Sequence, residues 1–255
     1  FCSGASAASS RMIHGGLRYL EFGEFKLVQE SIKERTLLLQ NAPHYVQPLP
    51  TTITIFSRFS GLFSSIKRIF KFKDNFTNER GALMIKIGLM FYDMYTRRQS
   101  DLPKHRFFFR KKSLRRYPGL TQNIISTCTY YDALINYPER LGLELVLDAK
   151  TANAHSNALN YVSCENGNNS KITLKDELTG KSFEVKPNIV INATGAWIDF
   201  TNQKLSKETR FIGGTKGSHL VLDHPELHES LDGDMFLYEN EDGRACVMVP
   251  WLGNV

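Results

Sequence analysis

A run of small residues followed by a glycine-rich basic segment is the part of the sequence best suited to chemistry. The chain opens with SGASAASSR over residues 3–11, and MIHGGLRYLE follows over residues 12–21. Small residues let the backbone approach a bulky ligand, and their amides and hydroxyls can bind phosphate oxygens. The adjacent Gly15 and Gly16 let the backbone lie against a flat ring, and the fork of donors on Arg18 can hold an anionic group. The segment therefore predicts a site for a flat, phosphate-bearing ligand and an anionic substrate.

Several motifs along the chain resemble those of one enzyme family. Residues 9–21 resemble the SSR/K-hydrophobic-IHGGLRYLE signature of FAD-dependent glycerol-3-phosphate dehydrogenases, which belong to the D-amino-acid-oxidase-like flavoprotein superfamily. Five further segments follow in the family's order: 34–44 (ERxxLLxxAPH), 87–93 (IGLxxYD), 130–141 (YYDxxxxxxRL, one residue longer here), 192–197 (NATGPW, with Ala196 in place of proline) and 216–219 (KGSH). The resemblance thus spans nearly the whole chain.

This resemblance implies an FAD cofactor that lies extended, with its ring over the HGG segment. The residues expected to contact FAD are Ser9, Ser10, Arg11, His14, Gly15, Gly16 and Leu17 in one group and Ala193, Thr194, Gly195 and Trp197 in another. The family's G-x-G-x-x-G loop, whose helix N-terminus binds the pyrophosphate, does not occur in the sequence. We therefore expect that loop upstream of Phe1 and late substrate-binding residues beyond Val255, which makes this chain an internal piece of a longer enzyme.

The implied reaction is oxidation of sn-glycerol 3-phosphate to dihydroxyacetone phosphate, with hydride passing to FAD and electrons then passing to quinone or oxygen. Arg18 is expected to bind the substrate phosphate or steer its hydroxyl, and Tyr19 and Lys216 are expected to join substrate binding. His219 is the candidate base because imidazole titrates near neutral pH, although a histidine is more often a structural hydrogen-bonding group. His14 is predicted to tether the backbone rather than to catalyse.

Two other functions remain open at this stage. A related flavin oxidase acting on an amino acid or 2-hydroxy acid would use Arg18 to bind a carboxylate instead of a phosphate. A non-catalytic membrane-binding module would keep the outline of the fold without the cofactor. The HGGLRYLE and KGSH segments favour the glycerol 3-phosphate enzyme over both.

Two further patterns give negative predictions. His219, His224 and His228 are spaced as metal ligands could be, but Pro225 interrupts any helix and no cysteine lies nearby, so we predict no metal. The basic residues within 110–116 follow three phenylalanines without a nucleic-acid recognition fold, so we predict no nucleic-acid partner.

Composition and charge set the surroundings in which this chemistry would take place. The 255 residues carry a net charge of +6, which suits an anionic partner, and the four cysteines are too scattered for a zinc site or a disulfide scaffold. The apolar positions of residues 58–73 recur at helical spacing among basic residues, which predicts a helix on an anionic membrane surface. We expect a cytoplasmic protein, peripheral on the inner face of the cytoplasmic membrane, and keep a homodimer open.

The elements that must position these residues alternate between helices and short strands. Helices are predicted over 24–39, 58–73, 81–96 (apolar nearly all round and therefore buried) and 141–150. Strands are predicted over 47–56 (exposed), at two or three places within 158–185, and over 189–191 (buried), with a loop after residue 130. The expected fold class is α/β (α+β). An FAD-binding Rossmann-like lobe (1–39 and 140–200) would be intermixed with a substrate lobe (40–139 and 201–255) on a mixed, largely antiparallel sheet.

Overall fold

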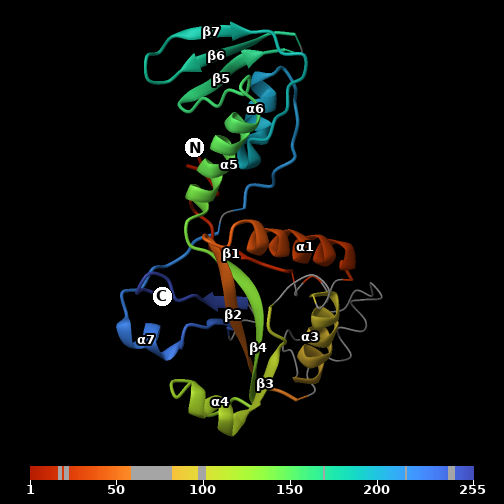
Figure 1. Cartoon of the computed structure of the whole chain (residues 1–255), viewed down its shortest axis with the longest axis vertical. Helices are drawn as coiled ribbons and strands as arrows, with labels where there is room; N and C mark the ends of the chain where they lie inside the picture. The colour runs from red at the N-terminus through yellow and green to blue at the C-terminus, as the bar shows by residue number, and fades with distance from the viewer. Residues whose placement is uncertain are drawn as a thin grey trace. The chain divides into compact units, whose positions relative to one another are not determined.

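The computed structural model describes two compact units. It covers residues 1–16, 19, 23–58, 82–96, 102–168, 170–215, 217–240 and 245–255. Unit 1 comprises Phe1–Ser9 with Pro138–His219, and unit 2 comprises Ser10–Tyr137 with Leu220–Val255 (Figure 1). The predicted membrane-surface helix at 58–73 lies, from residue 59 onward, outside the described residues.

Unit 2 is built on one curled mixed sheet. Its strands are β1 (Met12–Ile13), β2 (Val46–Ile55), β3 (Arg106–Phe109), β4 (Ser126–Ile135), β8 (Met235–Glu239) and β9 (Ala245–Met248). Their order is β1-β4-β2-β8-β9, and β3 also pairs with β4. Among the strands described, the pairing of β2 with β8 is parallel, and the other pairings are antiparallel. The predicted mixed, largely antiparallel sheet is confirmed.

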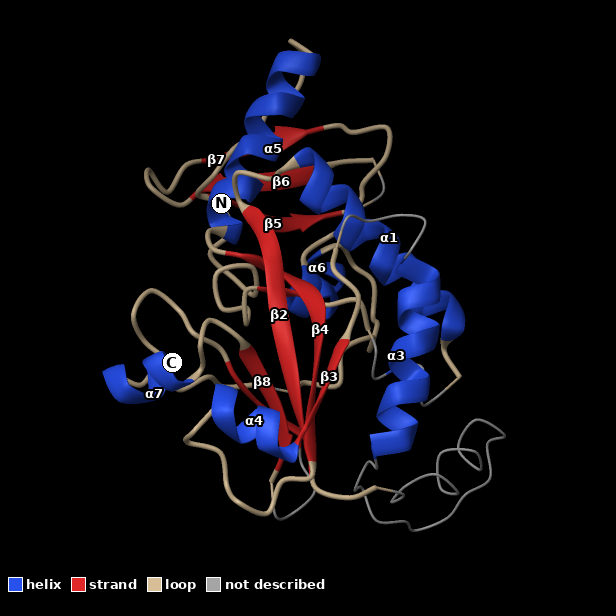
Figure 2. Ribbon diagram, turned by 60° about the horizontal axis from the view of Figure 1, so that its bottom comes forward, coloured by secondary structure: helices blue, strands red, loops and turns tan. Residues whose placement is uncertain are grey.

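Two helices cover one face of this sheet. α1 (Phe25–Asn41) and α3 (Ala82–Thr96) lie on the same side of β2 and β4 in both views (Figures 1 and 2). The core that they share with the strands contains Val28, Ile32, Ile55, Ile85, Leu89, Tyr92, Cys128 and Tyr130. The described residues of this unit also form two shorter helices, α4 (Arg110–Arg116) and α7 (Pro225–Ser230). The helix predicted over 24–39 is confirmed.

Three predictions for unit 2 are corrected. β2 was expected to be exposed, but it lies between β4 and β8; Pro48 and Pro50 do not interrupt the parallel pairing, which involves only residues 51–53.

The second correction concerns the stretch after residue 130, which is the second half of β4 rather than a loop. β4 is buried on both faces for most of its length and therefore lacks the alternating pattern that marks a half-exposed strand. The physical reasons are thus a central position in the sheet for β2 and burial on both faces for β4.

The third correction concerns α3, which was expected to be buried all round. Only one side of the helix meets the core, through Ile85, Leu89 and Tyr92. Five large apolar side chains are more than a third exposed: Leu83, Ile87, Met90, Phe91 and Met94. A single sheet can cover only one face of a helix, so an apolar composition alone did not determine the burial of α3.

Unit 1 contains a smaller, three-stranded antiparallel sheet. Its elements are α5 (Pro138–Ala152), β5 (Val162–Gly167), β6 (Ile172–Asp176), β7 (Ser182–Val185), the 3-10 turn η2 (Gly195–Trp197) and α6 (Ile198–Lys204). The strands run in the order β5-β6-β7. The strands predicted within 158–185 and the helix predicted over 141–150 are confirmed. The boundaries of the two units differ from those of the predicted lobes, since residues 10–39 fall in unit 2 and residues 201–219 in unit 1. Which lobe binds flavin and which binds substrate stays a prediction.

The predicted buried strand over 189–191 is wrong. These residues form no strand, and Ile189 and Ile191 are 78% and 83% exposed. A short apolar strand is stable only when neighbouring strands hydrogen-bond to it and helices cover it, and the described residues of unit 1 supply neither here. No helix in the described part of the chain has the length and apolar character needed to span a membrane.

Candidate functional site

A buried carboxylate on β4 holds the HGG segment in place. Asp132 is fully buried, and its Oδ2 lies 2.6 Å from Nδ1 of His14. Its Oδ1 accepts a hydrogen bond of 2.8 Å from the backbone N–H of Gly15. His14 and Gly15 come directly after β1, which pairs with the same strand that carries Asp132. His14 thus contacts a side chain 118 residues away, and its predicted role as a backbone tether stays a prediction.

Arg35 and Tyr92 complete the cluster from the two helices above the sheet. Nη1 of Arg35 donates to Oδ1 of Asp132 at 2.7 Å, and the hydroxyl of Tyr92 donates to the same oxygen at 2.9 Å. Arg35 also donates to the Tyr131 carbonyl at 3.1 Å and to the Tyr92 hydroxyl. One carboxylate therefore joins β1, α1, α3 and β4.

Helical and strand periodicity explain why these side chains meet. On α1, Val28, Ile32 and Arg35 follow the spacing of one helical stripe, which packs on the sheet. On α3, Ile85, Leu89 and Tyr92 follow the same spacing. Side chains on a strand alternate between faces, so Asp132 shares the α1 and α3 face with Cys128 and Tyr130. Arg35, Tyr92 and Asp132 therefore lie on the buried faces of their elements, where α1, α3 and β4 pack together.

The charges of the cluster support one another. Burial opposes ionisation of Asp132, but the hydrogen bond and charge of His14, the charge of Arg35 and the amide of Gly15 together lower the pKa of this carboxyl. The same burial, reinforced by the negative charge of Asp132, raises the pKa of the Tyr92 hydroxyl well above its ordinary value. Nε and Nη2 of Arg35 are buried and find no hydrogen-bond partner among the described residues. The Asp132 carboxylate is therefore the principal group that compensates the guanidinium charge.

Packing against this cluster requires glycine at position 15. A Cβ at Gly15 would lie 2.0 Å from the Tyr92 hydroxyl oxygen and 2.8 Å from Nη1 of Arg35. Gly16 has a φ of +76°, in the left-handed region that favours glycine. The sequence analysis explained both glycines by a flat ligand, and the structure adds a requirement from within the protein. Contact of either glycine with FAD stays a prediction.

The other predicted site residues near the HGG segment differ in their contacts and in how exposed they are. Arg11 adopts a φ of +60°, donates to the Asn136 carbonyl and places its guanidinium 5.0 Å from the centre of the Trp251 ring. Ser10 precedes it and is partly buried, and Tyr19 is 45% exposed. Leu17, Arg18 and Lys216 lie outside the described residues.

The second predicted cofactor group lies in unit 1, where an asparagine organises the turn. The Asn192 side chain donates to the Ile198 carbonyl and to the Asn202 side chain, and it accepts from the Thr194 hydroxyl. Gly195 has a φ of +58°. Ala193, Thr194, Gly195 and Trp197 are all exposed and therefore accessible to a ligand.

The opening small-residue run of the chain packs against this same turn. A Cβ at Gly4 would lie 3.0 Å from Cζ3 of Trp197, so the glycine permits close contact with the indole. Ser9, near the end of this run, is exposed, and Ser10 after it is partly buried. The structure therefore places Gly4 of the opening run beside Trp197, one of the residues that were expected to contact FAD.

The histidines late in the chain lie in different surroundings. His219 is exposed, in a stretch between α6 and α7 whose described residues form no helix or strand. His224 is the N-cap of α7, where its Nδ1 accepts a hydrogen bond from the backbone N–H of Leu227. The described residues contain no group of three histidine, cysteine or acidic side chains that could hold a metal ion. The roles predicted for His219 stay predictions.

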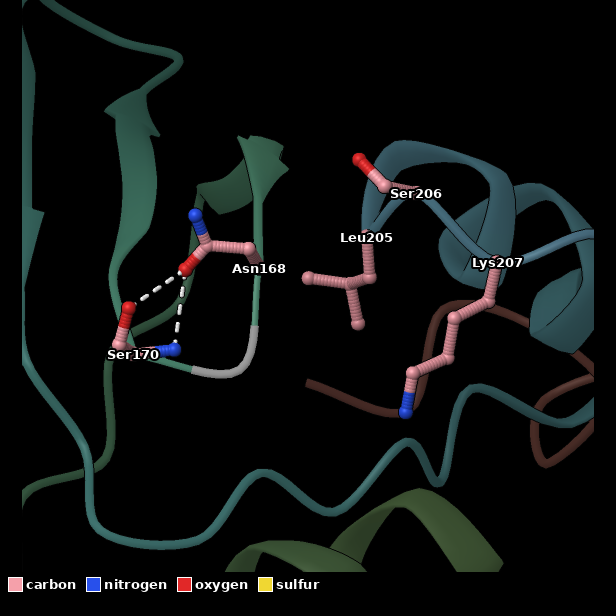
Figure 3. Close-up of a pocket in the computed structure, with 5 residues that line it drawn as sticks. All are labelled: Asn168, Ser170, Leu205, Ser206 and Lys207. Carbon is pink, nitrogen blue, oxygen red and sulfur yellow. Dashed lines mark hydrogen bonds between the residues drawn. The ribbon is translucent and has the colours of Figure 1, made fainter.

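A small hollow elsewhere on unit 1 has no connection with the predicted site residues. It measures about 330 Å³ and is lined by Asn168, Ser170, Leu205, Ser206 and Lys207 (Figure 3). Oδ1 of Asn168 accepts hydrogen bonds from the backbone N–H and the hydroxyl of Ser170, as the dashed lines show. These polar groups serve to close a turn.

The sequence analysis did not single out Arg35, Tyr92 or Asp132. All three lie inside the motif segments 34–44, 87–93 and 130–141, so a signal was present. Arg35 and Tyr92 each carry a polar group on the apolar side of a helix. That feature of the sequence could have identified them.

Comparison with known proteins identifies the family. A sequence model of the DAO family, described as FAD dependent oxidoreductase, matches residues 1–255. The chain belongs to this family. It is 36% identical over 271 residues to a glycerol-3-phosphate dehydrogenase of Synechocystis sp., covering 99% of the chain and 44% of that relative. An alpha-glycerophosphate oxidase of Enterococcus casseliflavus is 27% identical, with 98% of the chain and 39% of that relative covered.

Solved structures show the same fold. The structure of glycerol-3-phosphate dehydrogenase from Bacillus halodurans complexed with FAD matches with a TM-score of 0.61 at 20% identity, covering 100% of this chain and 39% of that one. L-proline dehydrogenase from P. horikoshii matches with a TM-score of 0.54 at 12% identity, covering 99% and 61%. These matches confirm the predicted fold class, whereas the family resemblance is confirmed by the DAO family model. The chain spans less than half the length of the curated relatives it matches.

The described residues fit part of an FAD site. Within unit 1, mostly exposed small residues at 3–9 and 193–195 offer backbone and hydroxyl groups to a ligand. Within unit 2, taken by itself, the backbone N–H of Gly15 is held by Asp132. The glycine-rich loop that would bind the pyrophosphate is not in this sequence. The FAD expected from the sequence is thus supported by the family, and the residues of this chain would supply only some of its contacts.

Proposed function

We propose that the protein of which this chain is a part oxidises sn-glycerol 3-phosphate to dihydroxyacetone phosphate with FAD. The observation that carries the proposal is the 36% identity, over 99% of the chain, to a protein named glycerol-3-phosphate dehydrogenase. An alpha-glycerophosphate oxidase among the relatives supports the same substrate class. At residue level, His14, Gly15, Arg35, Tyr92 and Asp132 come from the family-like motif segments and meet in one cluster.

In this proposal the chain supplies substrate-binding and proton-transfer groups. Bound FAD supplies the hydride acceptor for the carbinol carbon. Arg18 binds the phosphate through its paired donors, and Tyr19 and Lys216 assist. His219 would take the proton of the substrate hydroxyl, because an imidazole side chain can accept a proton near neutral pH.

An anaerobic visible spectrum of the full-length protein tests the proposal. Loss of the oxidised flavin band on addition of glycerol 3-phosphate, but not of amino acids or 2-hydroxy acids, is the expected result. A flavin that remains oxidised with glycerol 3-phosphate and bleaches with one of the other substrates would indicate a different oxidase of the same fold. A full-length protein that binds no flavin would favour the non-catalytic module.

We further propose that the electrons leave for quinone or oxygen at a membrane surface. The support is the basic, amphipathic pattern of residues 58–73, which suits the inner face of the cytoplasmic membrane. Co-sedimentation of the full-length protein with anionic vesicles at low salt is expected, and its absence contradicts the membrane role. Steady-state rates with a soluble quinone and with oxygen would separate the two acceptors, and sedimentation velocity would test the homodimer.

A further inference from the structure

Asp132 is connected at once to the HGG backbone and to both helices above the sheet. Its Oδ2 contacts Nδ1 of His14, while its Oδ1 accepts from Gly15, Arg35 and Tyr92. A carboxylate oxygen can only accept a hydrogen bond, so Nδ1 of His14 is the donor in the first contact. Both the backbone and the neighbouring ring are therefore oriented by one group.

We propose that Asp132 is a positioning residue for flavin binding, which acts by fixing the backbone of Gly15 and the ring of His14. The inference rests on the proposed FAD-dependent function. Asp132 is fully buried, so it acts through these two residues and not by touching a ligand. Rigid first contacts supported by a second layer of hydrogen bonds are a general requirement of a precise site.

The geometry leaves Gly15 little freedom. Its N–H is held by Asp132 at 2.8 Å, and its Cα faces the Tyr92 hydroxyl so closely that a Cβ would lie 2.0 Å from that oxygen. The segment is thus restrained by a hydrogen bond and by contact with the same cluster. Such restraint would reduce the conformational cost of binding a ring against the backbone.

The negative charge of Asp132 is the part of the cluster that cannot be replaced by a neutral group. An asparagine at this position would keep the size but offer one acceptor oxygen in place of two, and its NH2 group would face a donor. The His14 Nδ1–H or the Gly15 N–H would then lose its acceptor. The orientation of at least one of the two residues should change.

A second buried aspartate of unit 2 provides a matched control. Asp234 is 1% exposed, and it accepts from Thr52 at 2.7 Å, from the Tyr117 hydroxyl and from Arg116 at 3.2 Å. Thr52 is joined to Thr129, whose odd-numbered position puts it on the face of β4 opposite Asp132. Asp234 therefore has a similar set of partners without a contact to the HGG segment.

The test compares Asp132→Asn with Asp234→Asn in the full-length protein. FAD is first removed from each protein. The dissociation constant of FAD is then measured by titrating FAD back at a temperature at which each variant is folded. The visible flavin spectrum of each reconstituted protein is recorded last. We expect Asp132→Asn to weaken FAD binding about tenfold to a hundredfold and to shift the flavin band, as disturbed second-layer contacts do. Asp234→Asn should stay within about twofold of the wild type, which is the scatter of such comparisons.

The outcomes separate positioning from general stability. Equal losses in the two variants, or wild-type affinity in Asp132→Asn, overturn the inference. If Asp132→Asn does not fold, Tyr92→Phe is compared with Tyr117→Phe, and a weakening of FAD binding confined to Tyr92→Phe is expected. Equal affinities in that pair overturn the inference. A wild-type flavin that glycerol 3-phosphate does not bleach contradicts the proposed function alone, because FAD affinity does not depend on the substrate.

Discussion

At the scale of single residues, the glycine at position 15 can be tested directly. Gly15→Ala would place a Cβ 2.0 Å from the Tyr92 hydroxyl oxygen, so the segment or the tyrosine must move. We expect a loss of about 1–3 kcal/mol in the free energy of unfolding, the usual cost of overpacking. Urea denaturation would measure it.

Gly88 provides the control for this substitution. It lies within α3, and nothing occupies the space within 4 Å of a Cβ built there. Gly88→Ala should stabilise the protein by about 0.5–1 kcal/mol, because alanine has the higher helix propensity. An equal loss in both variants would show that the close contact at Gly15 is not the cause.

The depressed pKa of Asp132 predicts how stability depends on pH. A carboxyl whose pKa is lower in the folded state stabilises the protein fully above its unfolded pKa of about 3.9, and this contribution is lost as pH falls through the folded value. The difference in unfolding free energy between the wild type and Asp132→Asn should therefore be constant above about pH 5 and shrink in more acidic solution. Urea titrations of both proteins from pH 7 to pH 3 would measure it. A difference that does not change over this range would contradict the assignment.

At the scale of elements, local pattern was sufficient where polar and apolar residues recur regularly along one segment. The helix over 24–39 and the strands within 158–185 followed from their spacing and turn residues. The pattern failed where burial depends on distant partners: β4 is covered on both faces, α3 on only one, and residues 189–191 on neither. For the site, the motifs indicated the segments, but the convergence of Arg35, Tyr92 and Asp132 depends on how α1, α3 and β4 pack. The spacing of residues within any one segment does not predict how these three elements pack.

The packing of α1 on the sheet can be tested with two substitutions on the same helix. Ile32 is 1% exposed in the shared core, whereas Leu37 is 38% exposed. Ile32→Ala should reduce the free energy of unfolding by about 2–5 kcal/mol through lost burial and a residual cavity. Leu37→Ala should change it by less than about 0.5 kcal/mol, as exposed substitutions usually do. Thermal or urea denaturation would distinguish them, and comparable losses would mean that α1 packs through a different face.

At the scale of the whole molecule, the two units differ greatly in the core they contain. Among the described residues, the only buried apolar side chains of unit 1 are Ile172 and Leu205, and neither α5 nor α6 contains a buried residue. The remaining buried apolar side chains belong to unit 2. Since burial of apolar surface is the main favourable contribution to folding, unit 1 of this chain should be the less stable one.

The two tryptophans allow this difference to be measured, because the sequence has only two and each unit contains one. Trp251→Phe leaves Trp197 as the reporter of unit 1, and Trp197→Phe leaves Trp251 as the reporter of unit 2. In urea, we expect the fluorescence of Trp197 to change at a lower denaturant concentration than that of Trp251, while circular dichroism shows both transitions in each variant. Coincident midpoints would instead mean that the units unfold together as one cooperative structure, so that unit 1 derives its stability from unit 2 rather than from its own small core.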